Sequence, residues 1–409
     1  MMHPQMRRLA KPLAVSALPR GFEGAGATCG IKPSKKPDLA LIVSDRPASV
    51  ALVTTQNQFA APPIHITREH AQGGRARAII IDSGNANCAT GKRGLADARQ
   101  MCALTAKALG VKATEVLVNS TGVVGVPLPM EKVEAGIPEV VARVCPAGIN
   151  DAAVAMMSTD QTPKRATRRW SQGRAEVRLA AIGKGVGMIH PNMATMIAVM
   201  MTDATIAPAL LRRALRQAVN ASFNCLTVDG DTSTNDMVAV FANGASEATR
   251  IDKVSSTGFD RLVGAMMEVC QEIVHAMAAD GEGASRVAII RVKGSRTPEE
   301  ARTIARAVGS SSLVKTAIHG ADPNWGRIVV AVGNAGVEID PMAVSVSVAG
   351  TALLRKGKPV KFNAKSVSRA MTAPDVRVEV DMGLGRAEAT CWSSSLTEEY
   401  VRFNSAYTT

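Results

Sequence analysis

The sequence predicts a mixed α/β or α+β protein with several layers of β-sheet. Segments with the character of strands alternate along the chain with segments of helical period, a pattern typical of mixed folds. Apolar residues make up 46% of the 409 residues and charged residues 20%, which is enough apolar material for a large core. Aromatic residues make up only 3%, so we expect a core of small aliphatic side chains. A chain of this length predicts two or three lobes.

The first predicted strand, residues 78–82, is an apolar run that ends in a turn rich in glycine and asparagine, residues 83–87. A helix is predicted over residues 97–109, with Asp97 as its N-cap and Gly110 as the residue that ends it. Two further strands each lead into a segment of possible chemical interest. Residues 115–118 run into a predicted turn at 119–122, and residues 177–182 run into the glycine-rich stretch 183–187.

The second half begins with another strand and also contains the longest predicted helix. That helix, residues 259–278, has Leu262, Met266, Val269 and Ile273 at helical spacing and ends at the glycine-containing segment 280–283. The last third is predicted to be rich in β-structure. The other elements expected in this half are a strand at 196–201, a helix at 208–219, and strands at 287–292 and 328–332.

The net charge of +13, from 48 Lys and Arg against 35 Asp and Glu, predicts a diffuse surface surplus. A basic patch for nucleic acid or an anionic membrane is the alternative. The basic residues are scattered, however, and their densest groups, within 164–169 and 212–216, are short. The scarcity of aromatic residues also argues against a surface that stacks nucleic-acid bases. We therefore expect neither nucleic acid nor a membrane as a partner.

The seven cysteines are widely spaced and form no C-x-x-C pair, which favours reduced thiols and a cytoplasmic location. No apolar run approaches the roughly 18 residues of a membrane span. Residues 1–18 are a basic N-terminal extension that lacks the apolar stretch and cleavage site of a signal peptide. A transit peptide is an alternative with only weak support.

The most informative stretch is residues 183–197, where small and turn-forming residues precede Thr195 at the start of an apolar strand. Such a loop could strain the Ala194–Thr195 peptide, so that the Thr195 hydroxyl attacks the Ala194 carbonyl in an N→O acyl shift. Hydrolysis would then free the α-amine of Thr195. An α-amine titrates at about 7.7–8.0 and can serve as general base for the hydroxyl of the same residue. Alone, this stretch is weak evidence, because a glycine-rich turn before a strand is usually only a turn, and an isolated histidine such as His190 is more often structural than catalytic.

Three other segments have a functional and a structural interpretation. Residues 119–125 could direct polar groups at a developing oxyanion, or form an ordinary turn. Residues 224–236 resemble a Ca²⁺ loop in composition but lack the glycine and terminal glutamate of an EF-hand. The run 183–187 lacks the full G-x-G-x-x-G pattern, and no Walker lysine follows a glycine-rich loop. We therefore expect no metal ion and no bound cofactor.

Together these segments resemble the ornithine acetyltransferases of arginine biosynthesis, a family of bifunctional glutamate N-acetyltransferases. The resemblance extends over about residues 19–409, with the motifs in the family's order. The motif that resembles the family's self-cleavage site is Gly187-Met-Ile-His-Pro-Asn-Met-Ala-Thr-Met196. The other motifs are Gly30–Ala40, Asp82–Asn87, Val228–Asp236, Asp280–Ala284, His319–Arg327 and Tyr400–Thr409.

The resemblance implies a chain that cleaves itself into an α chain, residues 19–194, and a β chain, residues 195–409. It implies a fold like that of N-terminal-nucleophile hydrolases with its own topology, and an α2β2 assembly. Thr195 is then the nucleophile that takes the acetyl group of N-acetylornithine and passes it to glutamate. Thr121 and Gly122 match the oxyanion-hole positions. The positions that match substrate contacts are Ser158 or Thr159, Lys184, Thr195, Glu282, Asn404 and Thr409.

Two choices stay open at this stage. Members of the family differ in whether they also use acetyl-CoA as acetyl donor, and no dedicated CoA motif is present in the sequence. A self-processing aminopeptidase with an N-terminal Ser or Thr is the alternative enzyme, since it shares the activated nucleophile but passes its acyl group to water. A basic binding protein without catalysis is the non-enzymatic alternative, and it predicts salt-dependent retention of nucleic acid without chain cleavage.

Overall fold

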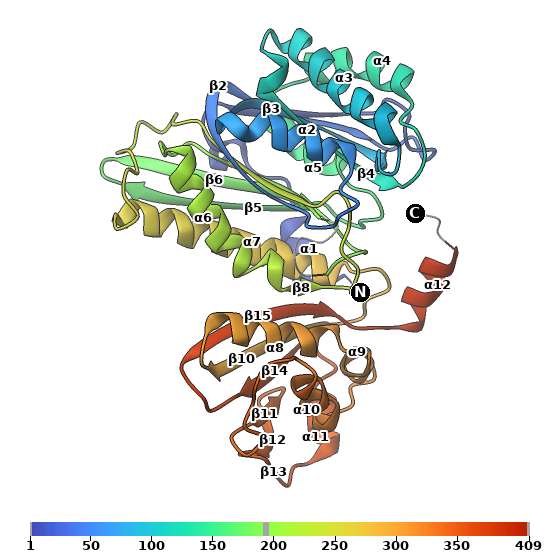
Figure 1. Cartoon of the computed structure of the whole chain (residues 1–409), viewed down its shortest axis with the longest axis vertical. Helices are drawn as coiled ribbons and strands as arrows, with labels where there is room; N and C mark the ends of the chain where they lie inside the picture. The colour runs from blue at the N-terminus through green and yellow to red at the C-terminus, as the bar shows by residue number, and fades with distance from the viewer. Residues whose placement is uncertain (1, 191–195, 407–409) are drawn as a thin grey trace.

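The computed structural model describes residues 2–190 and 196–406, in which the chain forms two lobes stacked along the long axis (Figure 1). The larger lobe contains an eight-stranded sheet and the smaller lobe a seven-stranded sheet. Helices flank the strands in both lobes (Figure 1). This confirms the predicted mixed α/β class with several sheet layers.

The large sheet has the strand order β4-β3-β2-β9-β7-β6-β5, and β1 pairs with β2. Its strands are β1 (Phe22–Ala27), β2 (Leu39–Thr54), β3 (Arg75–Asn85), β4 (Val116–Val123), β5 (Lys164–Gln172), β6 (Ala175–Lys184), β7 (Ile197–Thr202) and β9 (Met237–Ala242). The helices of this lobe are α1 (Pro4–Leu9), α2 (Pro62–His70), α3 (Gly91–Leu109), α4 (Met130–Ala142), α5 (Ile149–Ala155), α6 (Pro208–Asn220) and α7 (Thr257–Ala279).

The small sheet has the order β13-β12-β11-β14-β10-β15-β8. Its strands are β8 (Leu226–Thr227), β10 (Val287–Ser295), β11 (Ser345–Val348), β12 (Thr351–Arg355), β13 (Lys358–Pro359), β14 (Asp375–Asp381) and β15 (Ala387–Ser394). The helices that follow β10 in the chain are α8 (Pro298–Ser310), α9 (Ser312–His319), α10 (Trp325–Gly333), α11 (Ala364–Ala370) and α12 (Glu398–Ala406).

The large sheet is divided into two halves by the long strand β2. The first part of β2 pairs with β3, its last six residues pair with β9, and the β2–β3 register shifts between Val43 and Ala48. One hydrophobic cluster contains residues of both halves, and each half has a second cluster that it shares with helices. The lobe is therefore layered as helices, strands, strands and helices.

Alternation of side chains along the strands explains how each strand serves two layers. On β3, Ile79 and Ile81 belong to the cluster between the two halves, whereas Ala78 and Ile80 pack against α3 and α4. On β6, Ile182 faces the central cluster and Leu179 packs with α6 and α7. A strand that is buried on both faces therefore consists of a continuous run of apolar residues in the sequence.

Helix α7 lies between the large sheet and the small lobe. It shares one cluster with strand β7 and with Trp392 of β15, and the four apolar residues predicted at helical spacing are all buried. By length and composition α7 is a candidate membrane span, whereas the sequence predicted none. It is mostly buried within the protein, as expected for a core helix.

Helix α3 begins six residues earlier than predicted, at Gly91, so the assignment of Asp97 as N-cap is wrong. Two glycines in the first turn conceal the start of the helix from a propensity argument. Gly94 is required by packing there, because a Cβ at this position would lie 2.0 Å from the Thr90 hydroxyl oxygen. The predicted end at Gly110 is confirmed, since Gly110 adopts a left-handed conformation with φ of 68°.

The strand predicted at 328–332 is also wrong, because these residues lie in helix α10. Asn324 caps this helix by accepting the N–H of Arg327, and Ile328, Ala331 and Val332 are buried at helical spacing. Capping and burial thus outweigh the β-propensity of a β-branched run. The predicted turn at 119–122 is instead the end of strand β4.

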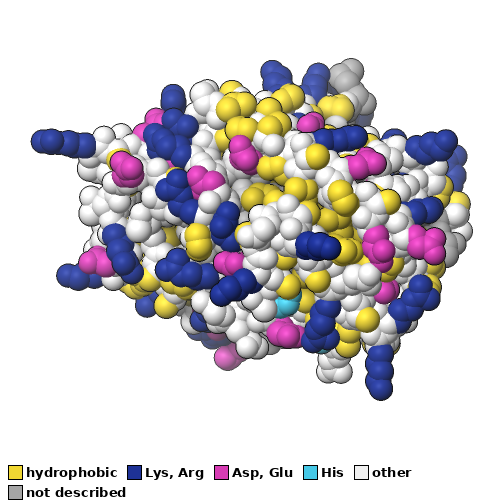
Figure 2. Space-filling view, turned by 90° about the horizontal axis from the view of Figure 1, so that it is seen from above, with side chains coloured by type: hydrophobic (Ala, Val, Ile, Leu, Met, Phe, Trp, Pro, Cys, Tyr) yellow, Lys and Arg dark blue, Asp and Glu magenta, His cyan; other side chains and the backbone are white. Residues whose placement is uncertain are grey.

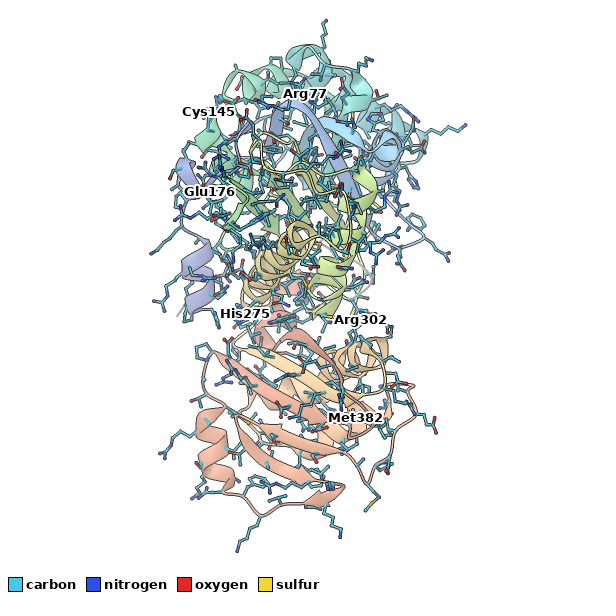
Figure 3. All side chains as sticks on the ribbon, turned by 90° about the vertical axis from the view of Figure 1, so that its left-hand side faces the viewer. Arg77, Cys145, Glu176, His275, Arg302 and Met382 are labelled. Atoms are coloured by element: carbon cyan, nitrogen blue, oxygen red, sulfur yellow. The ribbon has the colours of Figure 1, made fainter. Side chains whose placement is uncertain are left out.

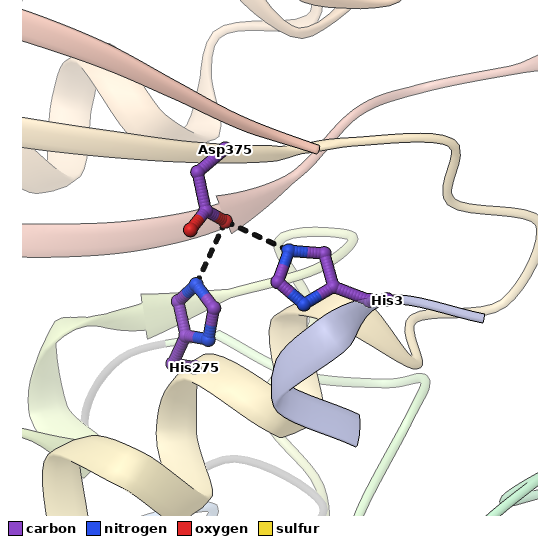
Figure 4. A group of neighbouring side chains, drawn as sticks. All are labelled: His3, His275 and Asp375. Carbon is purple, nitrogen blue, oxygen red and sulfur yellow. Dashed lines mark hydrogen bonds and ion pairs between the residues drawn. The ribbon is translucent and has the colours of Figure 1, made fainter. Parts of the chain in front are cut away.

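The N-terminal extension is folded onto the body, since α1 packs on α7. His3 and His275 both donate through Nε2 to Oδ1 of Asp375, at 2.9 and 2.8 Å (Figure 4). His275 lies at the level where the two lobes meet (Figure 3). The three side chains are close enough to hold a metal ion. Nδ1 of His3, however, accepts the N–H of Gln5 at 3.1 Å, so the ring hydrogen is on Nε2 and the cluster is built for hydrogen bonding.

Lysine and arginine side chains are spread over the face seen in Figure 2, where acidic side chains are interspersed among them. That face has no continuous basic stripe (Figure 2). All seven cysteines are free thiols, and five of them are buried.

Candidate active site

A cavity of about 350 Å³ lies where strands β4 and β6 end, beside residue Glu282 and helix α12. Seven of the residues predicted for the site line it: Thr121, Gly122, Ser158, Thr159, Lys184, Glu282 and Asn404. They come from five separate segments of the chain, so the fold alone brings them together. The predicted cleavage residues Ala194 and Thr195 and the predicted contact Thr409 lie outside the described residues.

Gly122 occupies a position that only glycine can fill. Its φ is 139°, in the region that side chains disfavour, and a Cβ there would lie 2.3 Å from the carbonyl carbon of Gly84. The two glycines are register partners in the parallel pair β3–β4, and the register is irregular from Gly84 to Asn85. This irregularity ends the regular pairing at the point where Thr121 and Gly122 reach the cavity.

Lys184, the last residue of β6, is the only lysine that lines the described cavity, and it is 2% exposed. Its Nζ donates to the hydroxyl oxygen of Thr121 at 3.1 Å and lies 3.9 Å from Oδ2 of Asp160. Burial lowers the pKa of Lys184, and the charge of Asp160 opposes this effect. A buried ammonium with one short hydrogen bond can still bind an anionic group.

Glu282 supplies a carboxylate to the same cavity. Its Oε1 accepts the hydroxyl hydrogen of Thr159 at 2.8 Å, and its Oε2 accepts the Asn404 amide at 3.1 Å. Gly187 lies against this side chain, because a Cβ there would be 2.4 Å from Oε2. Ser158 also lines the cavity, and its backbone N–H donates to Oδ2 of Asp160 at 3.2 Å. Thr159 is therefore the residue of the pair whose side chain is bound to Glu282.

Three buried charges lie behind these residues. Lys164 Nζ is 2.7 Å from Oδ1 of Asp160 and 2.7 Å from Oδ2 of Asp280, and all three side chains are 0% exposed. Burial would raise the pKa of Asp160, but the charges of Lys164 and Lys184 outweigh it and hold the pKa below the usual range. Asp160 is therefore an anion at neutral pH.

Most of the loop 229–236 lines the cavity, although none of the predicted site residues lies in it. Its composition had suggested only a weak resemblance to a Ca²⁺ loop. In the structure two of its carboxylates bind backbone. Asp229 accepts the N–H groups of Met188 and Ile189, at 2.5 and 2.7 Å, and Asp236 accepts the N–H of Met196 at 3.1 Å. The loop thus holds the chain on both sides of residues 191–195. In the sequence, only the resemblance of Val228–Asp236 to a family motif indicated that this loop belongs to the site.

The cavity therefore has one buried ammonium, the carboxylates of Asp229, Asp231 and Glu282, and a set of hydroxyl and amide groups. These groups match the carboxylate and ammonium of an amino acid in charge. The cavity volume also falls in the range of small-molecule sites.

Comparison with known proteins agrees with this geometry. The model of the ArgJ family matches residues 23–409. The arginine biosynthesis bifunctional protein ArgJ of Symbiobacterium thermophilum is 44% identical over 96% of this chain and 98% of its own length. Those of Thermus thermophilus and a Synechococcus strain are 45% and 43% identical, each over 96% of this chain.

Solved structures similar to this chain include the ArgJ protein of Bacillus halodurans, with 35% identity, coverage of 50% of this chain and 96% of that chain, and a TM-score of 0.49. The ornithine acetyltransferase of Mycobacterium tuberculosis complexed with ornithine has 34% identity, coverage of 44% and 97%, and a TM-score of 0.39. The aminopeptidase of Ochrobactrum anthropi, a variant of the Ntn hydrolase fold, has 14% identity, coverage of 68% and 92%, and a TM-score of 0.43. The near full-length family match and the identities above 40% show that the chain belongs to the ArgJ family of bifunctional arginine-biosynthesis proteins.

Proposed function

We propose that this chain transfers the acetyl group of N2-acetylornithine to glutamate through an acetyl ester on Thr195. The observation that carries the proposal is the single cavity that joins Lys184, Glu282 and the Thr121–Gly122 strand end. A carboxylate-binding ammonium, an ammonium-binding carboxylate and donors for an oxyanion are the groups that acetyl transfer between two amino acids requires. Family membership supports the same activity.

In the proposed cycle Thr195 is first freed by cleavage of the Ala194–Thr195 peptide. Its α-amine, a group whose ordinary pKa is about 7.7–8.0, takes the hydroxyl proton while Oγ attacks the acetyl carbonyl. The C–N bond to ornithine breaks, ornithine leaves with a proton, and the acetyl group remains as an ester. The amine of glutamate then attacks this ester, forms N-acetylglutamate and returns the proton to Thr195. Thr121 and the Gly122 N–H are the proposed donors to the oxyanion of both steps.

The same binding groups serve both substrates in this scheme. Lys184 binds the α-carboxylate, and Glu282 binds an ammonium group of the substrate. Thr159, or Ser158 beside it, and Asn404 bind through hydroxyl and amide groups, and Thr409 completes the site from the C-terminus. No cofactor is needed for this chemistry, because the nucleophile and its base belong to one residue.

Four further statements are part of the proposal. Acetyl-CoA is a second acetyl donor, in keeping with the word bifunctional in the names of the relatives. The α chain, residues 19–194, and the β chain, residues 195–409, remain associated as α2β2. The association of α with β is supported by the pairing of β6, before the cut, with β7, after it. The enzyme acts in the cytoplasm. Its partners are small-molecule substrates rather than nucleic acid or membrane.

The first experiment is an intact-mass spectrum under denaturing conditions. We expect two fragments, one of which begins at Thr195, from the 42.7 kDa chain. Thr195→Ala should give one uncut, inactive chain, whereas Thr195→Ser should retain some cleavage. Acetyl transfer from acetylornithine to glutamate, without hydrolysis of peptides, then distinguishes the enzyme from an aminopeptidase. Two normal fragments from Thr195→Ala would exclude Thr195 as the nucleophile.

A further inference from the structure

We propose that Asp160 is a positioning residue for substrate binding, because its carboxylate fixes both the place and the charge of Lys184. The inference rests on the proposed function, in which Lys184 binds the carboxylate of the amino-acid substrate. Asp160 is absent from the described lining of the cavity, so it acts through its neighbours rather than on the substrate.

Asp160 connects the two backbone segments that carry the polar groups on one side of the cavity. Its Oδ1 accepts the N–H of Gly185 at 2.7 Å, directly after Lys184. Its Oδ2 accepts the N–H of Ser158 at 3.2 Å and lies 3.9 Å from Lys184 Nζ. The side chain is completely buried, so water does not screen these contacts. A single carboxylate therefore sets the distance between the 158–159 segment and the lysine.

Lys164 extends this connection to the third segment of the cavity. Its ammonium lies 2.7 Å from both Asp160 and Asp280, and Asp280 is two residues before Glu282. A buried ion pair is often no more stabilising than apolar residues of the same volume. Stability alone therefore does not account for this charged group, whereas a role in placing Lys184 and Glu282 does.

The charges around Lys184 show why Asp160 is the residue to test. The anions that act on Lys184 are Asp160, Glu282 and Asp236, and the nearby cations are Lys164 and Lys32. Burial favours the neutral amine of Lys184, and Asp160 is the leading charge that opposes it. Removal of this one negative charge should let Lys184 lose its proton at a lower pH.

The test is calorimetric binding of glutamate to the processed protein between pH 6 and 9, with wild type, Asp160→Asn and Asp280→Asn. Glutamate is a suitable probe because, without an acetyl donor, it binds but does not react. For Asp160→Asn we expect the alkaline loss of affinity to begin about one pH unit lower than in wild type. This shift corresponds to roughly a tenfold weaker affinity on the alkaline side.

Asp280→Asn is the matched control, since it neutralises the other buried partner of Lys164 at the same 2.7 Å distance. Asp280 bonds to Lys164 and to the backbone N–H groups of Gln161 and Thr162, whereas Asp160 is the leading charge on Lys184. The alkaline limb of Asp280→Asn should therefore shift less than that of Asp160→Asn. Asp160→Glu keeps the charge but displaces it, and should weaken binding without moving the limb. If Asp160→Asn does not fold, Asp160→Glu still tests the placement of Lys184, and wild-type glutamate affinity in that variant would overturn the inference.

The inference would be overturned if the alkaline loss of glutamate affinity shifted equally in Asp160→Asn and Asp280→Asn, or in neither variant. It would also be overturned if Asp160→Glu moved the pH of that loss.

A double-mutant cycle adds a second criterion. In a Lys184→Met background the Asp160→Asn effect on glutamate affinity should vanish. Binding of glutamate by a wild type that transfers no acetyl group would refute the proposed function and leave the result for Asp160 standing. Absence of glutamate binding by wild type would refute both.

Discussion

Nζ of Lys184 donates to the hydroxyl oxygen of Thr121 across 3.1 Å, and both residues line the cavity. An ammonium has no acceptor, so Thr121 must accept in this bond and its own hydroxyl hydrogen remains available to another acceptor. The positive charge of Lys184 also polarises that hydroxyl. A donor held in this way before the reaction is what stabilisation of an oxyanion requires.

The first prediction concerns this hydroxyl. Thr121→Val keeps the shape of the side chain but removes the donor, so kcat for acetyl transfer should fall about 10²- to 10³-fold, the usual cost of one oxyanion donor. Thr121→Ser keeps the hydroxyl and should retain most of kcat. Steady-state kinetics with acetylornithine and glutamate provide the measurement. A wild-type kcat in the valine variant would remove Thr121 from the oxyanion hole.

The sequence predicted an element correctly where residues close together in the chain determine its structure. Gly110 ends α3 because its left-handed conformation favours glycine, and the apolar spacing within 259–278 fixes the buried face of α7. Local signals failed where packing decided the outcome. Residues 328–332, four of which are β-branched, are helical because an asparagine cap and one buried face outweigh propensity. Glycines in the first turn hid the start of α3.

At the site, the residues proposed to contact substrate were predicted from the sequence, whereas the residues that hold them in place were not. Resemblance of short motifs located seven residues that the fold brings to one cavity. The residues that support them were not predicted, because their partners are far apart in the chain. Lys164 and Asp280 are 116 residues apart, and Asp236 and Met196 are 40 residues apart. No periodicity or spacing in a single sequence records such pairs.

A second prediction follows from the bond between Asp236 and the N–H of Met196, directly after Thr195. Burial raises the pKa of Asp236 well above its usual value, and its Oδ1 accepts this N–H. Asp236→Asn keeps an oxygen acceptor in a side chain of the same shape and should cleave almost normally. Asp236→Ala loses one hydrogen bond, worth about 1 kcal/mol, and cleavage should slow roughly five- to tenfold. A gel time course of the freshly expressed chain measures both, and equal rates for alanine and wild type would contradict the role.

The third prediction concerns Gly122. Gly122→Ala places a Cβ 2.3 Å from the carbonyl carbon of Gly84 at a φ of 139°, so both the contact and the backbone become strained. We expect a loss of at least about 1–3 kcal/mol of stability, seen as a lower Tm, together with loss of acetyl transfer. The control is Gly264→Ala in α7, where no atom lies within 4 Å of the added Cβ. That change should raise stability by up to about 1 kcal/mol. An unchanged Tm for Gly122→Ala would show that β3 and β4 can separate at this point without cost.

The last prediction concerns the N-terminal extension. Its His3 donates to Asp375 of β14, which also accepts from His275 of α7. Burial would raise the pKa of Asp375, but the hydrogen bonds from His275 and His3 outweigh it and hold the pKa below the usual range. A depressed carboxyl pKa contributes stability that is present above the unfolded value of about 3.9 and is lost as the pH falls through the folded value. Asp375→Asn should therefore lower Tm at pH 7 and differ progressively less from wild type below about pH 4.

The Asp375 side chain is 38% exposed, so solvent screening limits the effect to about 1 kcal/mol, or about 2 °C in Tm. Amide hydrogen exchange of the peptide containing α1 should become faster in Asp375→Asn at pH 7, because its attachment to α7 and β14 is weakened. Asp252→Asn, at an exposed site, removes the same charge and should change neither measurement. If exchange of the α1 peptide is unchanged in Asp375→Asn, packing of α1 on α7 is sufficient to hold the extension, and the hydrogen bonds to Asp375 contribute only to the junction between the lobes.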